Sequence, residues 1–361
     1  MVMATKASRN VLRQILDLAR WAPSGDNTQP WRFEITADDG IAIHGHDTRE
    51  HVIYDFDGHA SHMAHGALLE TLRLAATRFG LRAEWRIRPE RPDSAPIYDV
   101  TLHPSDLVED RLVPFIEARC VQRRPMRTTP LQAGQKEALI AAVGPDYSLQ
   151  FFESLNDRLT VARLLWKNAF LRLTCPEAYQ VHREVIEWNT RYSTDRIPDQ
   201  AVGVDPLTAG LMRWVLQSWA RVDFFNRYLA GTVAPRIQLD FIPAIACASH
   251  LLLRPKRRQA GLADHLAAGV AMQRLWLTAS SLGLYLQPEM TPVIFRWYVQ
   301  AKRQLSIEPK IDAGAIELAR QFEQLSAIRP DDGFAFFCRI GHSKAPRSRS
   351  LRKELHELLM N

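Results

Sequence analysis

A chain of 361 residues, 46% hydrophobic and 24% charged, has enough apolar side chains for one large domain or two ordinary ones. The formal net charge of +6 permits acidic partners, but no apolar run reaches the roughly 18 residues of a membrane span. The four cysteines lie far apart without a CxxC pair, so neither a disulfide framework nor a zinc knuckle is indicated. We therefore expect a soluble, cytoplasmic protein.

The first predicted element is an amphipathic helix that ends in a polar bend. Apolar residues recur at helical spacing over residues 11–19, and Pro23 then blocks the helix because its ring fixes φ and removes a backbone donor. The short polar residues that follow include Gly25, a residue type that lets a backbone approach a ligand closely. Residues 32–35 alternate as a strand does. We therefore expect residues 23–31, called the elbow below, to join a helix to a strand.

A long helix further along the chain has a near-copy in its second part. Residues 33–54 are typical of a hairpin, and a helix is predicted from about residue 59 to residue 79. At a constant offset of 203 residues, Gly66, Leu72, Leu74, Ala76, Gly80 and Leu81 recur as Gly269, Leu275, Leu277, Ala279, Gly283 and Leu284. Self-similarity at a fixed spacing indicates a duplicated unit. We predict two related halves, 1–112 and 113–361.

The second half contains an insertion at about residues 155–245. This segment has no counterpart in the first half and carries many aromatic residues on predicted helices, which are broken near residues 193–206. Aromatic residues at helical spacing usually pack, which favours a satellite core. The other interpretation is a helical cap that closes over a ligand and defines a substrate cavity. Both interpretations stay open, and each can hold for a different face of the helices.

Two clusters of like residues suggest other ligands. His59, His62 and His65 would lie along one side of the long helix, but no carboxylate or cysteine completes a metal shell, so we expect no metal. Residues 344–353 are rich in Lys and Arg, as nucleic-acid binders can be, yet no recognition motif accompanies them. We expect neither nucleic acid nor a membrane as a partner, and no Ser/His/Asp or Cys/His nucleophile stands out.

The elbow carries a family resemblance. Ala-Pro-Ser-x-x-Asn-x-Gln-Pro-Trp at residues 22–31, after an amphipathic helix, resembles the signature of the FMN-dependent nitroreductase family. With both long helices in one chain, the sequence is most similar to the single-chain tandem branch of that family. The resemblance implies an α+β, nitroreductase-like fold, a fused pseudo-dimer with helices 66–80 and 269–283 packed near each other, and FMN bound where the halves meet.

The resemblance also implies which residues hold the FMN. The elbow occurs only in the first half, whereas the arginines that resemble the family's phosphate-binding residues occur only in the second, so one complete site is expected and its mirror partner is lost. Arg123 matches the position whose cation stabilises negative charge at flavin N1 and O2, although Arg124 is an alternative. The cofactor-binding residues are expected to be Pro23, Ser24, Gly25, Asn27, Gln29, Arg119, Arg123, Pro288, Glu289, Met290, Arg347 and Arg349.

By the same resemblance, the reaction is hydride transfer from NADH or NADPH to the flavin and on to a small acceptor such as a quinone or nitroaromatic. Flavin N5 carries the chemistry, and a backbone N–H from the segment 287–291 is expected to meet it. The alternative is a protein that holds FMN without turnover, as a store or as an accessory to a partner such as an adenylyltransferase-like domain. A monomeric pseudo-dimer and a higher-order dimer both remain open.

Overall fold

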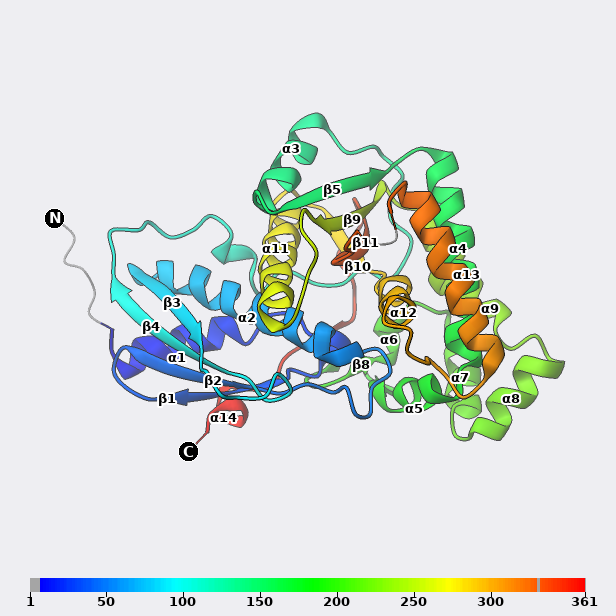
Figure 1. Cartoon of the computed structure of the whole chain (residues 1–361), viewed down its shortest axis with the longest axis horizontal. Coiled ribbons are helices and arrows are strands. Elements are labelled where there is room, and N and C mark those ends of the chain that lie inside the picture. The colour runs from blue at the N-terminus through cyan, green and yellow to red at the C-terminus, as the bar shows by residue number, and fades with distance from the viewer. Residues whose placement is uncertain (1–6, 330–331, 361) are drawn as a thin grey trace.

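Two antiparallel sheets with the same strand order form the frame of the molecule, of which the computed structural model describes residues 7–329 and 332–360 (Figure 1). The first sheet has the order β1-β2-β4-β3, with β1 Trp31–Ile35, β2 Gly40–Gly45, β3 Leu81–Ile87 and β4 Ile97–Pro104. The second has the order β5-β9-β11-β10, with β5 Tyr147–Phe152, β9 Ser249–Pro255, β10 Tyr285–Pro288 and β11 Phe336–Gly341. The fold is therefore of the α+β class, as predicted.

The helices that belong to the two sheets also follow the same order along the chain. In the first, α1 (Arg9–Ala19) precedes β1 and α2 (His59–Thr77) separates β2 from β3. In the second, α3 (Ala133–Ala142) precedes β5 and α11 (Leu262–Ser281) separates β9 from β10. Each sheet thus belongs to a helix–strand–strand–helix–strand–strand unit, and longer connections are inserted only in the second.

Helices α2 and α11 pack against each other, as expected for residues 66–80 and 269–283, and their backbones touch at a glycine of each helix. A Cβ built on Gly66 would lie 2.0 Å from the carbonyl oxygen of Leu266, and one built on Gly269 would lie 2.0 Å from that of Met63. Met63 and Leu266 are themselves separated by the offset of 203 residues. The two contacts are therefore equivalent under exchange of the helices, and no side chain fits at either glycine.

The histidines of α2 have local partners in this frame. His59 stacks on His265 of α11 with ring centroids 3.7 Å apart. His65 contacts the Tyr98 hydroxyl at 3.0 Å and the Pro30 carbonyl at 2.7 Å. Within residues 7–329 and 332–360, no group of three or more His, Cys, Asp or Glu residues could hold a metal ion. His59 thus takes part in the packing of α2 on α11, whereas His65 joins α2 to the elbow and to β4.

The insertion forms a helical layer on the right of Figure 1, and this layer is called the cap below. It contains α4 Leu155–Thr174, α5 Pro176–Val185, β6 Ile186–Glu187, β7 Tyr192–Ser193, β8 Ile197–Pro198, α6 Asp199–Val202, α7 Pro206–Val215, α8 Trp219–Tyr228, α9 Val233–Pro235, the π-helix η4 Arg236–Phe241 and α10 Ile242–Ile245. Two further helices, α12 (Thr291–Gln300) and α13 (Pro309–Ser326), separate β10 from β11. No described helix is long and apolar enough to cross a membrane.

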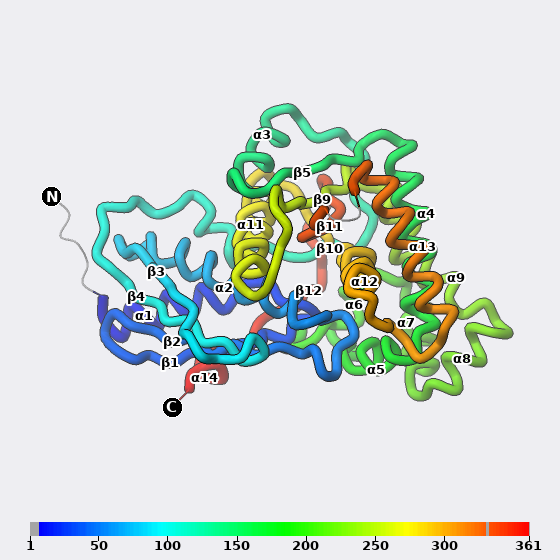
Figure 2. Tube along the Cα trace, viewed as in Figure 1, coloured from blue at the N-terminus to red at the C-terminus, as the bar shows by residue number. Residues whose placement is uncertain are grey.

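The last part of the chain returns to the first sheet (Figure 2). Strand β12 (Arg349–Ser350) pairs in parallel with β7, and α14 (Leu355–Leu358) follows. Leu359 then bridges Phe33 of β1, and the backbone N–H of Met360 donates to the Phe33 carbonyl at 2.7 Å. Residues 348–352 are thereby carried from the second sheet, past the cap, to the elbow of the first.

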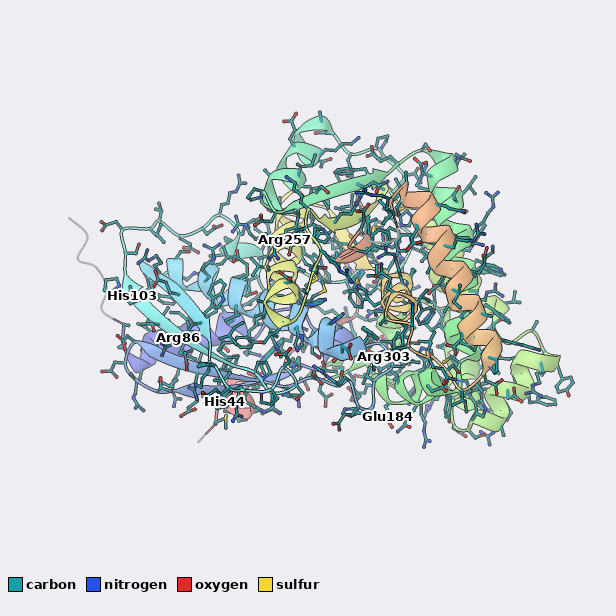
Figure 3. The ribbon with its side chains drawn as sticks, viewed as in Figure 1. His44, Arg86, His103, Glu184, Arg257 and Arg303 are labelled. Atoms are coloured by element: carbon teal, nitrogen blue, oxygen red, sulfur yellow. The ribbon has the colours of Figure 1, made fainter. Side chains whose placement is uncertain are left out.

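Short 3₁₀ turns and ion pairs complete the junctions between these parts. The turns are η1 Gly25–Asn27, η2 Phe56–Gly58 and η3 Val113–Phe115. Arg303, which is labelled in Figure 3 and follows α12, forms an ion pair with Asp57 of η2. This pair joins the connection between α12 and α13 to the loop that precedes α2.

Candidate cofactor site

A cavity of about 620 Å³ lies where the elbow, helices α2 and α11, the second sheet, the insertion and the returning chain meet. Its volume is within the range of about 300–1,000 Å³ that is typical of small-molecule sites. Of the residues expected to bind a cofactor, Pro23, Ser24, Gly25, Asn27, Arg119, Arg123, Pro288, Glu289, Met290 and Arg349 line it, whereas Gln29 and Arg347 do not. The elbow and the arginines, far apart in sequence, thus face one cavity.

The elbow holds an unusual backbone conformation. Asp26, Asn27 and Gln29 have φ values of +50°, +66° and +50°, which are left-handed. Each such non-glycine residue costs about 1–2 kcal/mol, and strain of this kind gathers at functional sites. Gly25, expected to let the backbone approach a ligand closely, has no positive φ; it lines the cavity, and a Cβ there would meet nothing within 4 Å. The strain therefore falls on its polar neighbours.

Gln29 does not line the cavity, and its side chain holds the elbow in place. It is fully buried, and its side-chain amide donates to the carbonyls of Asn27 at 3.0 Å and Thr194 at 2.8 Å. Its side-chain oxygen accepts from the backbone N–H of Lys353 at 2.9 Å. Gln29 thereby ties the elbow to the cap and to the returning chain.

Three arginines gather at one end of the cavity: Arg119, Arg349 and Arg352. Each donates to a backbone carbonyl, Arg119 to Trp21 at 2.8 Å, Arg349 to Glu117 at 2.8 Å and Arg352 to Ala22 at 3.0 Å. None of the three forms an ion pair with a carboxylate among the described residues. The Nε atoms of Arg119 and Arg349 are buried and have no hydrogen-bond partner there.

Burial lowers the pKa of two of these three arginines, and the repulsion between their positive charges adds to that effect. Burial and the neighbouring Arg349 lower the pKa of Arg119 to about 10. Burial, Arg119 and Arg349 hold the pKa of Arg352 well below its ordinary value. A buried cationic cluster without an anion is unfavourable, and the forked guanidinium group suits phosphate. The arginine cluster therefore fits a phosphate group. The Arg119 guanidinium also lies 4.6 Å from the centroid of the Trp276 ring.

Arg352 was not expected at the site, and Arg347 was. The Arg347 side chain is exposed and is not among the residues that line the cavity. Arg352 is 7% exposed and lines the cavity together with Arg119 and Arg349. The basic run at residues 344–353 was the available sequence signal for Arg352.

Arg123 lines the cavity, whereas Arg124 does not. Burial lowers the pKa of Arg123 to about 10, and the nearby Asp26 opposes that shift. The Arg123 carbonyl accepts from Arg339 Nη2 at 2.7 Å, and Arg339 Nη1 donates to Glu289 at 2.8 Å. The position of Arg123 is thus fixed by a buried network that includes the segment 287–291.

The Glu289 side chain is part of this network, and its backbone N–H donates to another residue of the protein. Its carboxylate contacts His250 Nδ1 at 2.7 Å as well as Arg339. Burial alone would lower the pKa of His250, but the Glu289 carboxylate outweighs burial and raises it to about 10. The Glu289 N–H donates to the Phe337 carbonyl at 2.8 Å. Within the expected segment, the free N–H groups are therefore those at the start of α12, from Met290 and Thr291.

Several side-chain amides present unpaired oxygens to the same space. Asn27 Oδ1, Asn168 Oδ1 and Gln287 Oε1 are buried and have no hydrogen-bond partner among the described residues, and all three residues line the cavity. Their side-chain nitrogens donate hydrogen bonds within the protein; that of Asn168 donates to the Thr291 hydroxyl at 2.7 Å. Buried acceptors without donors call for a ligand that supplies N–H or O–H groups. Asn168 belongs to the cap, where no local signal could have indicated it.

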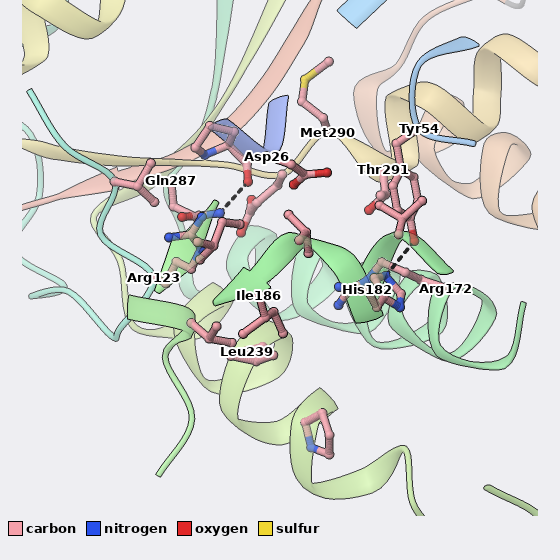
Figure 4. Close-up of a pocket in the computed structure, with 18 of the residues that line it drawn as sticks. Asp26, Tyr54, Arg123, Arg172, His182, Ile186, Leu239, Gln287, Met290 and Thr291 are labelled. Atoms are coloured by element: carbon pink, nitrogen blue, oxygen red, sulfur yellow. Dashed lines mark hydrogen bonds between the residues drawn. The ribbon is translucent and has the colours of Figure 1, made fainter. Parts of the chain in front are cut away.

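A second polar group lies on the cap side of the cavity (Figure 4). The Tyr54 hydroxyl is 2.8 Å from His182 Nε2, and Arg172 pairs with Asp240 at 3.3 Å. In Figure 4, Tyr54, His182 and Arg172 lie opposite Arg123, Asp26 and Gln287, with Ile186 and Leu239 also in view. The cavity therefore has an arginine end, a middle portion at Arg123 and the start of α12, and a cap side.

Among known proteins, only solved structures are similar to this chain. No family model matches the sequence, and no curated protein matches it. A nitroreductase with bound FMN from Desulfitobacterium hafniense is 11% identical, covers 68% of this chain and 95% of its own, and has a TM-score of 0.35. Iodotyrosine deiodinase bound to FMN and 3-iodo-L-tyrosine is 11% identical, with coverages of 67% and 95% and a TM-score of 0.36.

A third structure, the FMN-dependent nitroreductase NfnB from Mycobacterium smegmatis in complex with NADPH, is 15% identical, with coverages of 68% and 96% and a TM-score of 0.35. These neighbours are FMN-bound proteins of the nitroreductase fold. Identities and TM-scores this low carry no argument about activity. The case for a ligand therefore rests on the cavity of this chain.

Proposed function

We propose that the chain is an FMN-dependent oxidoreductase that binds one FMN in this cavity with its phosphate on Arg119, Arg349 and Arg352. One observation carries the proposal. The buried Arg119 and Arg352 and the half-buried Arg349 lie together at the cavity without a carboxylate partner in the described chain, and the Nε atoms of Arg119 and Arg349 are unpaired there. A phosphate dianion would neutralise the cluster and accept from those donors.

The remaining lining fits the other parts of FMN. Asn27, Asn168 and Gln287 offer acceptors for ribityl hydroxyl groups and the pyrimidine N–H, and Ser24 lies in the same elbow. When bound, FMN supplies two-electron hydride chemistry. Arg123 would stabilise negative charge on the pyrimidine edge, and the N–H groups at the start of α12 would donate to the ring. The chain itself needs no nucleophile.

We further propose that the two halves, 1–112 and 113–361, descend from one duplicated unit, with the insertion at about 155–245 as a cap. The shared strand order and the paired glycine contacts of α2 and α11 support this view. The elbow comes from the first half and the arginines from the second. One FMN per chain follows from this division.

Turnover is favoured over storage of the flavin. Leu211 and Leu229 line the cavity and are 49% and 55% exposed, so the cavity reaches the surface through the cap. A reductant, NADH or NADPH, and a small acceptor therefore have a route to the ring. A protein that only sequesters FMN would need this opening closed.

The arginine cluster provides the test. Arg119→Ala and Arg352→Ala should each weaken FMN binding by about 10- to 100-fold, because each removes a hydrogen bond between charged groups. Arg347→Ala, an exposed arginine of the same basic run, is the matched control and should bind FMN as the unaltered protein does. Affinity is measured by flavin fluorescence quenching. Equal affinity in all three variants would contradict the proposed phosphate site.

A further inference from the structure

Helices α7 and α8 form the outer corner of the cap, at the lower right edge of the molecule (Figure 1). No residue of Pro206–Val215, the whole of α7, is buried, although the helix is rich in apolar side chains. Leu207, Leu211 and Trp214 follow one another at the spacing of a single helix face, and all three are exposed, Leu207 at 87%. An apolar helix face normally packs against a core, whereas this one meets solvent.

The exposed apolar side chains of the two helices are joined through aromatic contacts. The Trp214 ring lies 5.7 Å from the Phe225 ring, measured between centroids. The Phe224 ring lies 6.2 Å from that of Phe225 and 5.3 Å from that of Tyr228. We call the exposed members of this set the cap-tip patch: Leu207, Leu211, Trp214, Phe224, Tyr228 and Leu229. A continuous exposed patch of this kind marks a surface that binds a partner.

Positive charge is mixed into the cap-tip patch. Residues 206–228 carry a net charge of +2, from three arginines and one acidic residue: Arg213, Arg221, Arg227 and Asp223. The Arg221 guanidinium lies 4.4 Å from the centroid of the Trp214 ring, and Asp223 pairs with Arg227 at 2.8 Å. Exposed aromatic and leucine side chains among arginines are typical of segments that lie in the headgroup region of an anionic membrane.

Two other occupants fit the cap-tip patch less well. A second copy of the chain would meet it through the same patch in a symmetric contact, and two positively charged patches would repel each other. A protein partner would need a pocket shaped to side chains as exposed as Leu207 and Tyr228, because stable protein interfaces are closely packed. A fluid bilayer adapts to protruding side chains without a matching shape. The charge and the shape of the patch therefore favour a membrane surface.

We propose that the cap-tip patch binds the surface of an anionic membrane. Its aromatic and leucine side chains lie at the boundary between headgroups and acyl chains, and its arginines contact the headgroup phosphates. Such binding is peripheral and needs no spanning helix. The sequence indicated no membrane partner, because it left open whether these helices form a core or a lid, and only the fold shows that their apolar face is exposed.

The test is cosedimentation of the full chain, without added FMN, with phosphatidylcholine vesicles that either contain or lack phosphatidylserine. The vesicles with phosphatidylserine should bind the protein about tenfold more tightly or better, because the positive charge of the patch is attracted to them. Added salt should reduce this preference, since it screens exposed charges. Equal binding to the two kinds of vesicle, or no binding to those with phosphatidylserine, would overturn the proposal.

Two pairs of variants test whether the cap-tip patch is the surface that binds. Phe224→Ser should weaken binding to phosphatidylserine vesicles about tenfold, because it removes one inserted ring. Ile140→Ser, at a similarly exposed position on α3, is its control and should bind as the unaltered protein does. Leu207→Ser and its control Val108→Ser, at positions 87% and 88% exposed, repeat the comparison at a residue outside the aromatic contacts. Equal binding by the patch variants and their controls would assign the binding to another surface.

Sedimentation of the protein alone tests the second copy as an occupant. The chain should show no self-association that Phe224→Ser abolishes; a dimer lost in that variant would assign the patch to a second copy and overturn the proposal. FMN takes no part in these measurements, and Leu207 and Phe224 do not line the cavity. The outcome is therefore separate from that of the proposed cofactor site.

Discussion

Asn27 shows at the scale of one residue how the elbow is prepared for a ligand. Its backbone is left-handed at φ +66°, and its side-chain nitrogen donates to the Arg196 carbonyl at 3.3 Å. The side-chain oxygen is buried without a hydrogen-bond partner in the described part of the chain, at a residue that lines the cavity. Because an unpaired buried acceptor costs about 1–3 kcal/mol, a donor from the cofactor would recover that free energy.

Replacement of Asn27 by glycine tests this role without straining the backbone, since glycine adopts positive φ freely. Asn27→Gly should weaken FMN binding about three- to tenfold through loss of one neutral hydrogen bond. Glu90→Gly makes the same kind of change at an exposed left-handed residue (φ +61°) and should leave FMN affinity unaltered. Fluorescence titration compares the two. A variant at Asn27 that binds as tightly as the control would remove this residue from the site.

Individual site residues could be predicted from sequence where a local motif specifies them. Ser24, Asn27 and Arg119 lie in such motifs, and all three line the cavity. Arg352 could not be chosen over Arg347, because its direction depends on the pairing of β12 with β7 and on the Gln29 contact with Lys353. Those contacts join residues more than 150 positions apart, and no local pattern records them.

The packing of α2 on α11 is the best-determined feature at the scale of elements. The two helix backbones meet at Gly66 and at Gly269, where added Cβ atoms would each lie 2.0 Å from a carbonyl oxygen. No shift of a flexible side chain could relieve such a contact, because the obstructing atoms are backbone. The helices themselves would have to separate.

Gly66→Ala and Gly269→Ala should therefore each lower the free energy of unfolding by about 3 kcal/mol or more, at the upper end of overpacking effects. Gly134→Ala in α3 meets nothing within 4 Å and should be neutral or stabilise by about 0.5–1 kcal/mol, as helical alanine does. Urea unfolding gives all three values. If the α2 and α11 variants matched the α3 variant, the helices would not pack as described.

Element prediction succeeded where periodicity was strong and failed where pairing is long-range. The helical period was enough to predict α2, and the 203-residue repeat to predict α11; their contact was expected from the family resemblance. The return of the chain to β1 through Leu359 was not predicted, because it consists of very short pairings without a strand-like pattern. The cap was predicted to be helical, but its sequence left both a satellite core and a lid open; part of it lines the cavity, while Phe224 and Tyr228 are exposed.

Buried titratable groups govern the whole molecule's response to pH. Burial lowers the pKa of His59 to about 2 and those of His65 and His182 to about 3. Between those values and 6.5 the unfolded chain binds protons that the folded chain refuses, so stability falls as pH falls. Each histidine contributes about 1.4 kcal/mol per pH unit. Burial raises the pKa of Asp240 to about 6, so its carboxyl binds a proton more readily in the folded state; this offsets the effect of one histidine.

The protein should consequently lose at least about 1 kcal/mol of unfolding free energy per pH unit between pH 6 and 4.5. On the alkaline side, His250 has its folded pKa raised to about 10, so the stability it provides below pH 6.5 is lost as pH rises toward 10. A maximum near pH 6.5 is expected in urea-unfolding measurements made across this range. Stability that is flat or rising from pH 6 to 4.5 would be inconsistent with buried neutral histidines.

The visible absorption spectrum of the purified protein, mixed with FMN and freed of unbound ligand, tests the central claim most directly. A cavity shared by the elbow and the arginine cluster should retain about one flavin per chain, with a band near 450 nm that bleaches when NADH or NADPH is added. Protein that emerges colourless, with no flavin retained at any FMN concentration, would contradict it.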